Sequence, residues 1–434
     1  MKHTLQLLLL AALSASAAMA QINCNSGAAA QKLVCEFPFS TGALTNASSL
    51  GGSSSVAQNA TVTATAINTG IATQLSQLPL ASASAGTVEV YKAGVPETFT
   101  NLGPILVDRA QVIGKGKVFI GATASQYVFT DIDGISLGNL PFAYSQISYY
   151  PGTNNPLSTT YTTESTNLSF RLDQLVTVAT IGVSNRVDLS IIVPYERVSL
   201  GASANNSESY VQNAGSTVAS GPSMNAIQHT AGTATGIGDI TFNGKGVLWG
   251  GEGERATFSG GLTVRTPTGD DLNFLGSGSW GFDLYTVYSY LARVSPHARI
   301  GYRWNTTSEL YNPTDKFGDD QSLPGGLEYD FGADTSLSRS FTVALDVLGD
   351  QYLNAPIYER TTIPLTVTAG SSSTPLTLPS SQVVNSSYTI SNLSTGIKWA
   401  PEKYVVFSAN LLTQLINAGL RSRPTPLLGI SCKF

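Results

Sequence analysis

Few residues in this sequence could carry out chemistry, and they are widely spaced. After the first twenty residues only two histidines remain, His229 and His297. Hydrolysis by a side-chain nucleophile needs a base beside that nucleophile and a third group that holds the base. His229 falls in an expected loop, whereas His297 opens an expected strand at the opposite end of the fold. We therefore predict that the protein is not an enzyme.

Metal, cofactor and nucleic-acid sites are also not expected. Asp131-Ile132-Asp133-Gly134 and Asp270-Asp271 could hold a cation, but the first lacks the distal acid of a calcium-binding loop, and both fit turns. The sequence has no Cys/His cluster and no glycine-rich phosphate loop between a strand and a helix. Lys and Arg number 23 against 28 Asp and Glu, which gives a net charge of −5 and argues against a nucleic-acid partner.

Charged residues beyond residue 113 fall at alternate positions of extended segments. In one segment Ala298 and Ile300 alternate with Arg299 and Arg303. Such period-two alternation predicts strands with one apolar and one polar face. We expect twelve such strands, at about 115–130, 164–181, 187–200, 239–249, 255–266, 282–291, 297–305, 326–334, 339–351, 388–399, 404–416 and 427–434.

The connections between these strands alternate between long and short after the first strand. This alternation is typical of a closed up-and-down antiparallel barrel in an outer membrane, and twelve is an even number, as in single-chain bacterial barrels. Only 12% of residues are charged, and no apolar run beyond the N-terminus approaches the length of a membrane helix. We predict an all-β transmembrane barrel over residues 113–434; a secreted soluble β-helix or sandwich is the alternative.

In such a barrel the apolar face contacts lipid and the polar face lines the lumen. Charges of both signs on one face suggest paired networks across the wall, although any one of them could only hydrate or brace the interior. The expected lumen-lining residues are Arg171, Asp173, Asp188, Arg265, Asp283, Arg299, Arg303, Glu328, Asp330 and Asp346.

Aromatic residues near the strand ends fit the same picture. Trp249 and Trp399 lie beside expected short turns, and Trp280 and Trp304 beside expected long loops, as a girdle at each membrane interface requires. The chain stops on Phe434, which we expect to serve as the C-terminal signal for the barrel-assembly machinery. Cys432 shares the lipid-facing side of the last strand and is expected to be inert.

The N-terminal region differs from the rest of the chain. Residues 1–20 read as a signal peptide with an A-x-A cleavage site; an uncleaved membrane anchor is the alternative. Residues 21–112 are low in complexity and could form a plug or lie in the periplasm. Within them, Ile67 and Ile71 begin a helical spacing that Pro79 would end, and Cys24 and Cys35 could form a disulfide.

Several stretches resemble one protein family. They are IGVSNRVDL (181–189) with Val193-Pro194-Tyr195, GIGDI (236–240), LTVRTPTGD (262–270), Gly276-Ser277-Gly278 leading to Phe282-Asp283, and HARIGY (297–302). Over roughly residues 114–305 the chain resembles the phenol meta-pathway degradation (MetA-pathway) family of outer-membrane β-barrel transporters. The resemblance implies passage of hydrophobic or aromatic compounds. The Ser/Thr-rich loops expected at 202–235 and 353–386, and the long N-terminal segment, depart from it.

These observations predict an exported barrel in the bacterial outer membrane that conducts small, hydrophobic or aromatic, solutes. The expected partners are outer-membrane lipid, the solute and the barrel-assembly machinery. The alternative is a structural or surface-display barrel with a filled lumen, whose long outer loops bind partners.

Overall fold

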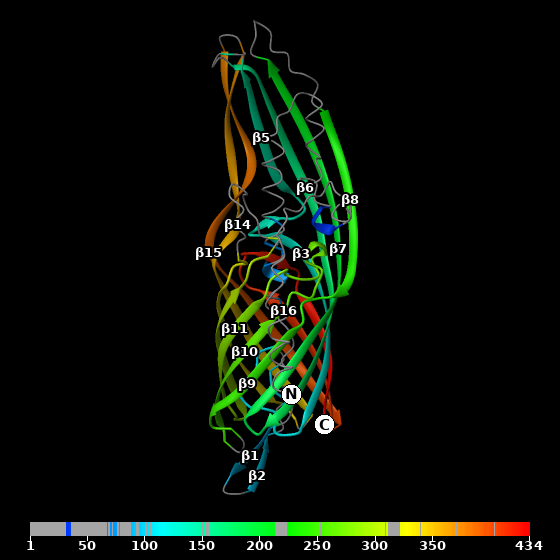
Figure 1. Ribbon diagram of the computed structural model, residues 1–434, viewed down its shortest axis with the longest axis vertical. Coiled ribbons are helices and arrows are strands. Elements are labelled where there is room, and N and C mark those ends of the chain that lie inside the picture. The colour runs from blue at the N-terminus through cyan, green and yellow to red at the C-terminus, as the bar shows by residue number, and fades with distance from the viewer. Residues whose placement is uncertain are drawn as a thin grey trace, which may run out of the picture.

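A computed structural model describes most of the chain beyond residue 101 and short pieces before it (Figure 1). The described residues are 32–35, 67, 70–71, 73–75, 78, 88–92, 95–99, 102–104, 106–149, 152, 156–212, 224–251, 254–308, 310, 322–338, 340–369, 372–402 and 404–434. The expected signal peptide (1–20) and Cys24 lie outside them. Cys35 is disulfide-bonded, whereas Cys432 is free.

The described chain is almost entirely β-structure. Its strands are β1 (Val88–Lys92), β2 (Val95–Phe99), β3 (Val118–Ile132), β4 (Ile135–Ser136), β5 (Leu140–Tyr149), β6 (Pro156–Ser184), β7 (Val187–Gln212), β8 (Met224–Ile237), β9 (Thr241–Trp249), β10 (Ala256–Arg265), β11 (Gly281–Tyr290), β12 (Val294–Asn305), β13 (Gly326–Ser336), β14 (Phe341–Ala369), β15 (Ser372–Glu402), β16 (Val405–Gln414), β17 (Leu420–Ser422) and β18 (Thr425–Lys433). Two short 3-10 helices, η2 (Leu33–Cys35) and η4 (Asp271–Asn273), accompany them.

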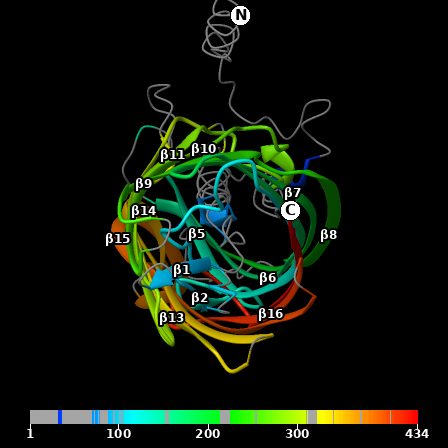
Figure 2. The same cartoon turned by 90° about the horizontal axis from the view of Figure 1, so that it is seen from below.

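Twelve of the described strands close into an antiparallel barrel (Figure 2). Neighbours in sequence pair around the wall, and β3 closes the ring between β18 and β6. Thr123 of β3, for example, pairs with Gly429 on one side and Val176 on the other. Closure leaves no sheet edge in the wall, so the backbone amides are paired where lipid offers no partner. The predicted fold class and all twelve predicted strands are confirmed.

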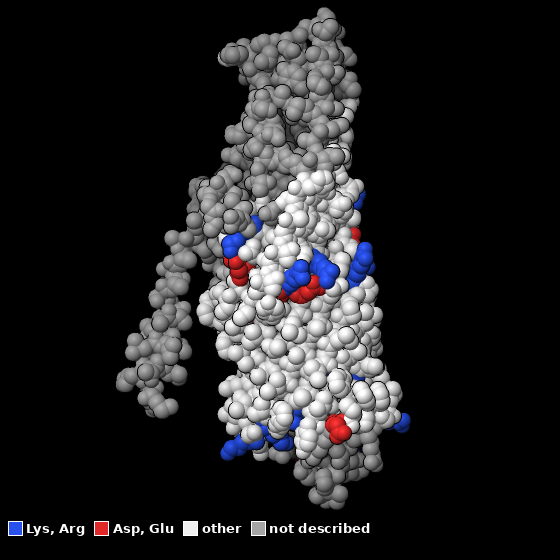
Figure 3. Space-filling view, turned by 90° about the vertical axis from the view of Figure 1, so that its right-hand side faces the viewer, with Lys and Arg blue, Asp and Glu red and all other residues white. Residues whose placement is uncertain are grey.

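The outer surface has an uncharged band bounded by charged residues. On the face in Figure 3, Lys, Arg, Asp and Glu form a belt at mid-height and a second row near the lower end, with uncharged atoms between them. Leu284, Ile300 and Leu345 are among the large apolar side chains exposed on the barrel wall. A closed barrel with such a band places the chain in the bacterial outer membrane.

No helix among the described residues is long and apolar enough to cross a membrane.

Several strands are much longer than a membrane requires. β14 has 29 residues and β15 has 31, whereas about 9–11 tilted residues cross a bilayer. The excess lies at the long-connection end, where β5, β6, β7, β8, β14 and β15 rise above the barrel (Figure 1). The expected loops at 202–235 and 353–386 are therefore wrong over most of their length, because they contain the ends of β7 and β15, β8 and the far half of β14.

The cause of this error is composition. Ser, Thr, Asn and Pro are typical of loops in a sequence, but beyond the membrane both faces of a strand can meet water. A strand there loses its apolar–polar alternation, and only its β-branched residues, such as Ile357 and Ile363, remain as a signal.

The expected helix exists and lies inside the barrel. Residues 67, 70, 71 and 73–75 are helical, and Ile67 and Ile71 are buried. The Gln74 side chain accepts a hydrogen bond from the amide of Leu420 and donates one to the Tyr388 hydroxyl at 3.4 Å. Viewed along the barrel, this helix lies within the ring of strands (Figure 2).

Candidate functional site: the barrel interior

The interior of the barrel has a charged wall formed by β11, β12, β13 and β14. Arg299 of β12 donates to Glu328 at 2.5 Å and to Asp283, and its guanidinium lies 4.3 Å from the centre of the Tyr285 ring. Four residues further along β12, Arg303 donates to the second oxygen of Glu328 at 3.0 Å. Glu328 thus bridges the two arginines, one with each oxygen.

More acids complete this network. Arg303 also donates to Asp350 at 3.2 Å, and Asp330 lies 3.7 Å from Arg299. The two arginines therefore face four carboxyl groups from three other strands. Gly301 lies between the arginines on the inner face, and a Cβ there would approach Asp283 Oδ1 to 2.6 Å. The missing side chain leaves the space that Asp283 occupies.

The structure places eight of the ten expected lumen residues on the inner face. Five of them belong to this network. Asp346 is hydrogen-bonded to His297 at 2.8 Å, Asp188 accepts from the amide of Ile113 at 2.8 Å, and Arg265 donates to Asn305 at 2.9 Å. The inward-facing members are Asp188, Arg265, Asp283, Arg299, Arg303, Glu328, Asp330 and Asp346.

Arg171 and Asp173 differ from the expectation, because they lie on the outer face of β6. Their ion pair measures 2.8 Å, and the Arg171 side chain is 49% exposed. On this part of β6 the apolar residues Phe170 and Leu172 are buried and the charged ones point outward. Above the membrane the outer surface meets water, so polarity no longer marks the lumen face.

A second layer of the interior is a segment that precedes β3. Residues 102–104 and 106–113, here termed the strap, run along the inner wall near the short-turn end. Lys398 of β15 donates to the carbonyl oxygens of Leu102 and Pro104 at 3.3 and 2.5 Å. At the other end of the strap, Ile113 reaches Asp188 of β7. The strap therefore crosses from β15 to β7.

Polar side chains of the wall satisfy the strap's backbone. The Ala110 amide donates to Ser289 at 3.0 Å, its carbonyl accepts from Ser259, and the Arg109 carbonyl accepts from Lys245 at 2.7 Å. A buried irregular segment needs such partners, because each unpaired backbone group costs free energy. These inward Ser and Lys residues thus hold the strap.

The strap also joins an acidic pair on the wall. Arg109 donates to Asp334 at 3.2 Å, and His297 lies between Asp334, at 3.4 Å from Nδ1, and Asp346, at 2.8 Å from Nε2. All four side chains are buried. Arg109, His297 and Asp334 were not among the expected site residues. His297 and Asp334 share strand parity with Arg299 and Asp330, so continuing the alternation would have found them; Arg109 carried no such signal.

A third layer, nearer the long-connection end, is apolar. Tyr127 and Phe129 of β3 stack with ring centres 6.1 Å apart, Phe129 stacks on Phe170 of β6 at 5.1 Å, and Phe170 meets Phe274 edge-on at 5.9 Å. We call these four residues the aromatic ladder. They share one buried cluster with Ile67 and with residues 33–35, so N-terminal residues belong to the same apolar core as the ladder.

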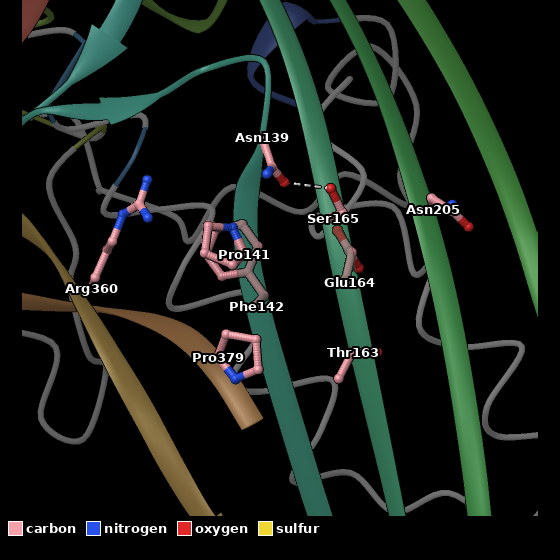
Figure 4. A pocket seen from close by; sticks show the side chains of 9 residues that line it. All are labelled: Asn139, Pro141, Phe142, Thr163, Glu164, Ser165, Asn205, Arg360 and Pro379. Atoms are coloured by element: carbon pink, nitrogen blue, oxygen red, sulfur yellow. Dashed lines mark hydrogen bonds between the residues drawn. The ribbon is translucent and has the colours of Figure 1, made fainter. Parts of the chain in front are cut away.

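Above the membrane band, the extended strands border an open cleft of about 460 Å³ (Figure 4). Glu164 of β6 lies at its wall and is 3% exposed. One of its oxygens accepts from Thr166 at 2.6 Å, and the other has no hydrogen-bond partner among the described residues. Burial raises the pKa of Glu164 to about 7. This residue was not expected, since its segment begins where the alternation fades.

The expected girdle residues lie at the outer surface. Trp249 and Trp399 are exposed near the short turns, and Trp304 is exposed at the long-connection end, while Trp280 is half-buried. Phe434 is exposed, and its backbone pairs with Val118. Their roles as interface anchors and assembly signal stay predictions. Within the described residues, no group of three or more His, Cys, Asp or Glu is placed to hold a metal ion.

Part of the chain matches a known protein family. Residues 146–347 match the family described as "Putative MetA-pathway of phenol degradation", so the resemblance seen in the sequence is confirmed over that range. No curated protein matches the chain.

Solved structures similar to this chain include outer-membrane proteins. The COG4313 outer membrane channel from Pseudomonas putida F1 is 11% identical, with a TM-score of 0.40, and the match covers 75% of this chain and 98% of that one. A Pseudomonas aeruginosa FadL homologue is 10% identical, with a TM-score of 0.31 and coverages of 75% and 91%. The Ralstonia pickettii toluene transporter TbuX is 9% identical, with a TM-score of 0.27 and coverages of 74% and 90%.

Proposed function

We propose that this protein is an outer-membrane channel for small hydrophobic solutes, aromatic ones included, and that residues 21–112 act as its plug. The observation that carries the proposal is the aromatic ladder of Tyr127, Phe129, Phe170 and Phe274 inside the barrel. Channels for polar solutes have polar, water-filled interiors. Aromatic rings on the inner wall favour an apolar occupant, because each buries a large area from water.

The N-terminal residues supply such an occupant in the structure. Ile67 and Ile71 belong to the same buried cluster as the ladder. An apolar solute that enters from the long-connection end would compete with these side chains for this apolar core. The family resemblance, to a group described by phenol degradation, supports the same solute class.

Transport can be tested with an apolar dye that an intact outer membrane excludes. Cells would express the mature chain or a variant that lacks residues 21–112, and dye fluorescence would report entry. Planar-bilayer conductance of the same two proteins would report an ion-permeable lumen. We expect dye entry with the full chain and larger conductance steps with the truncated one.

The pattern of results separates the alternatives. Dye entry only with the truncated chain would support the channel and make the plug closed at rest. No entry and no conductance in either form, with normal insertion into the membrane, would contradict the channel. That result would favour a structural or surface-display barrel with a filled lumen.

A further inference from the structure

The cleft above the membrane combines features of a small-molecule site. It is formed by strands from two separate parts of the sequence. Asn139 precedes β5, Pro141 lies in β5, Glu164 in β6 and Asn205 in β7, whereas Arg360 lies in β14 and Pro379 in β15 (Figure 4). Its volume of about 460 Å³ lies in the range of ligand pockets. It belongs to neither the charged wall nor the aromatic ladder.

One carboxyl oxygen of Glu164, a residue that lines the cleft, has no donor among the described residues. Glu164 Oε1 accepts from Thr166, whereas Oε2 is buried with no partner among the described residues. A buried carboxyl oxygen without a donor is costly, and a ligand that donates to it would remove that cost. The Ser165 hydroxyl, on the same strand, is already engaged with Asn139 at 2.7 Å.

Part of the remaining lining is apolar, and the rest is polar, with Asn139, Thr163, Ser165, Asn205 and Arg360. Pro141, Phe142 and Pro379 line the cleft around Glu164, and the Figure 4 view shows their rings grouped together. Flat apolar surfaces of this kind suit a ring or a short hydrocarbon body. This apolar part, next to the buried Glu164 oxygen, favours a solute with an apolar body and a donor group over a plain hydrocarbon.

We propose that this cleft is an entry site that binds small solutes with an apolar body and one hydrogen-bond donor, which Glu164 recognises. The donor can be a hydroxyl or an ammonium group, since both present a hydrogen to the carboxyl oxygen. This inference deepens the proposed channel function, on which its role as an entry site rests.

Three probes, each with a single phenyl ring, test whether binding requires a hydrogen-bond donor. Toluene has no donor, benzyl alcohol has a hydroxyl and benzylamine has an ammonium group. Their dissociation constants would be measured by ligand-observed NMR with the mature chain in lipid nanodiscs, and empty nanodiscs would correct for partition into lipid. We expect the two donor probes to bind about tenfold or more tightly than toluene. Benzylamine binding tighter than benzyl alcohol would identify the ammonium group as the preferred donor, and the reverse order the hydroxyl.

Variants at Glu164 test the residue itself. Glu164→Met removes both acceptor oxygens, so the donor probes should lose their advantage over toluene. Glu164→Gln keeps one acceptor oxygen and should retain the benzyl alcohol preference while losing any extra affinity for benzylamine. Asp173→Asn, on the outer face of the same strand, is the matched control and should change none of the constants.

The proposal is overturned if the three probes bind wild type equally, or if both Glu164 variants keep the wild-type preferences. Its failure is distinct from failure of the channel. Dye entry into cells reports the channel, and it can persist when donor recognition is absent, whereas binding in nanodiscs reports the cleft whether or not solutes cross.

Discussion

Arg109 and Asp334 form a buried ion pair between two parts of the chain that are 225 residues apart. The guanidinium belongs to the strap, and the carboxylate belongs to β13 near the short-turn end. The same carboxylate lies 3.4 Å from His297. The pair therefore fixes an irregular segment to the barrel wall at a point where neither side chain reaches water.

Replacing Arg109 by Met should destabilise the protein by about 3–5 kcal/mol, because Asp334 would be left as a buried carboxylate that has lost its arginine. The free energy of unfolding would be measured by urea titration in lipid vesicles. Lys117→Met is the control, since Lys117 is exposed just beyond the strap, and it should change stability by less than about 0.5 kcal/mol. Equal effects of the two variants would mean that the pair does not hold the strap.

A second prediction compares two arginines, Arg299 and Arg171, that the sequence predicts to line the lumen. Arg299→Ala should cost about 3–5 kcal/mol, because it leaves Glu328 and Asp283 buried without their main cation. Arg171→Ala removes a half-exposed pair and should cost less than about 1 kcal/mol. Unfolding titrations of the two variants give the comparison, and similar losses would contradict the assignment of Arg171 to the outer face.

The alternation of apolar and polar side chains was sufficient to predict the barrel, but not how far its strands extend beyond the membrane. In β12, Ile300 and Tyr302 face outward and Arg299 and Arg303 inward, as the sequence indicates, because one face contacts lipid and the other contacts charge. On β6 the same rule misplaces Arg171. The rule that polar side chains face the lumen assumes that lipid covers the outer face, so it fails where the strand leaves the membrane.

The contents of the lumen could be predicted even less. The helical spacing of Ile67 and Ile71 predicts a helix, but only the contacts of Gln74 with Tyr388 and Leu420 place it inside the wall. The strap has no periodicity at all. Its position depends on wall side chains that pair with its backbone, and a sequence shows such pairs only as isolated Ser, Thr and Lys residues.

The lipid-facing surface gives a third prediction. Ile300 is 63% exposed in the middle of β12, and Ile300→Arg should destabilise the barrel by about 2–4 kcal/mol, the cost of an arginine near the bilayer midplane. Leu337 is 72% exposed in the short turn after β13, so Leu337→Arg should cost about 0–1 kcal/mol. Unfolding in vesicles measures both variants. A low cost at Ile300 would mean that this part of the barrel lies outside the hydrocarbon.

Glu164 gives a prediction about pH. Its pKa rises from an ordinary 4.5 to about 7 in the folded chain because the carboxyl is buried. Between these two values the folded chain holds a proton that the unfolded chain has released, so stability should fall as pH rises through this window and stay level above it.

The size of this loss is on the order of 3 kcal/mol. Glu164→Gln cannot ionise, so its unfolding free energy should lack this contribution. The difference between wild type and Glu164→Gln, measured in vesicles from about pH 4 to pH 8, isolates the carboxyl from all other titrating groups, because these are common to both proteins. A difference that does not change with pH would show that Glu164 ionises as readily in the folded chain as in water, and the cleft would then be open to solvent.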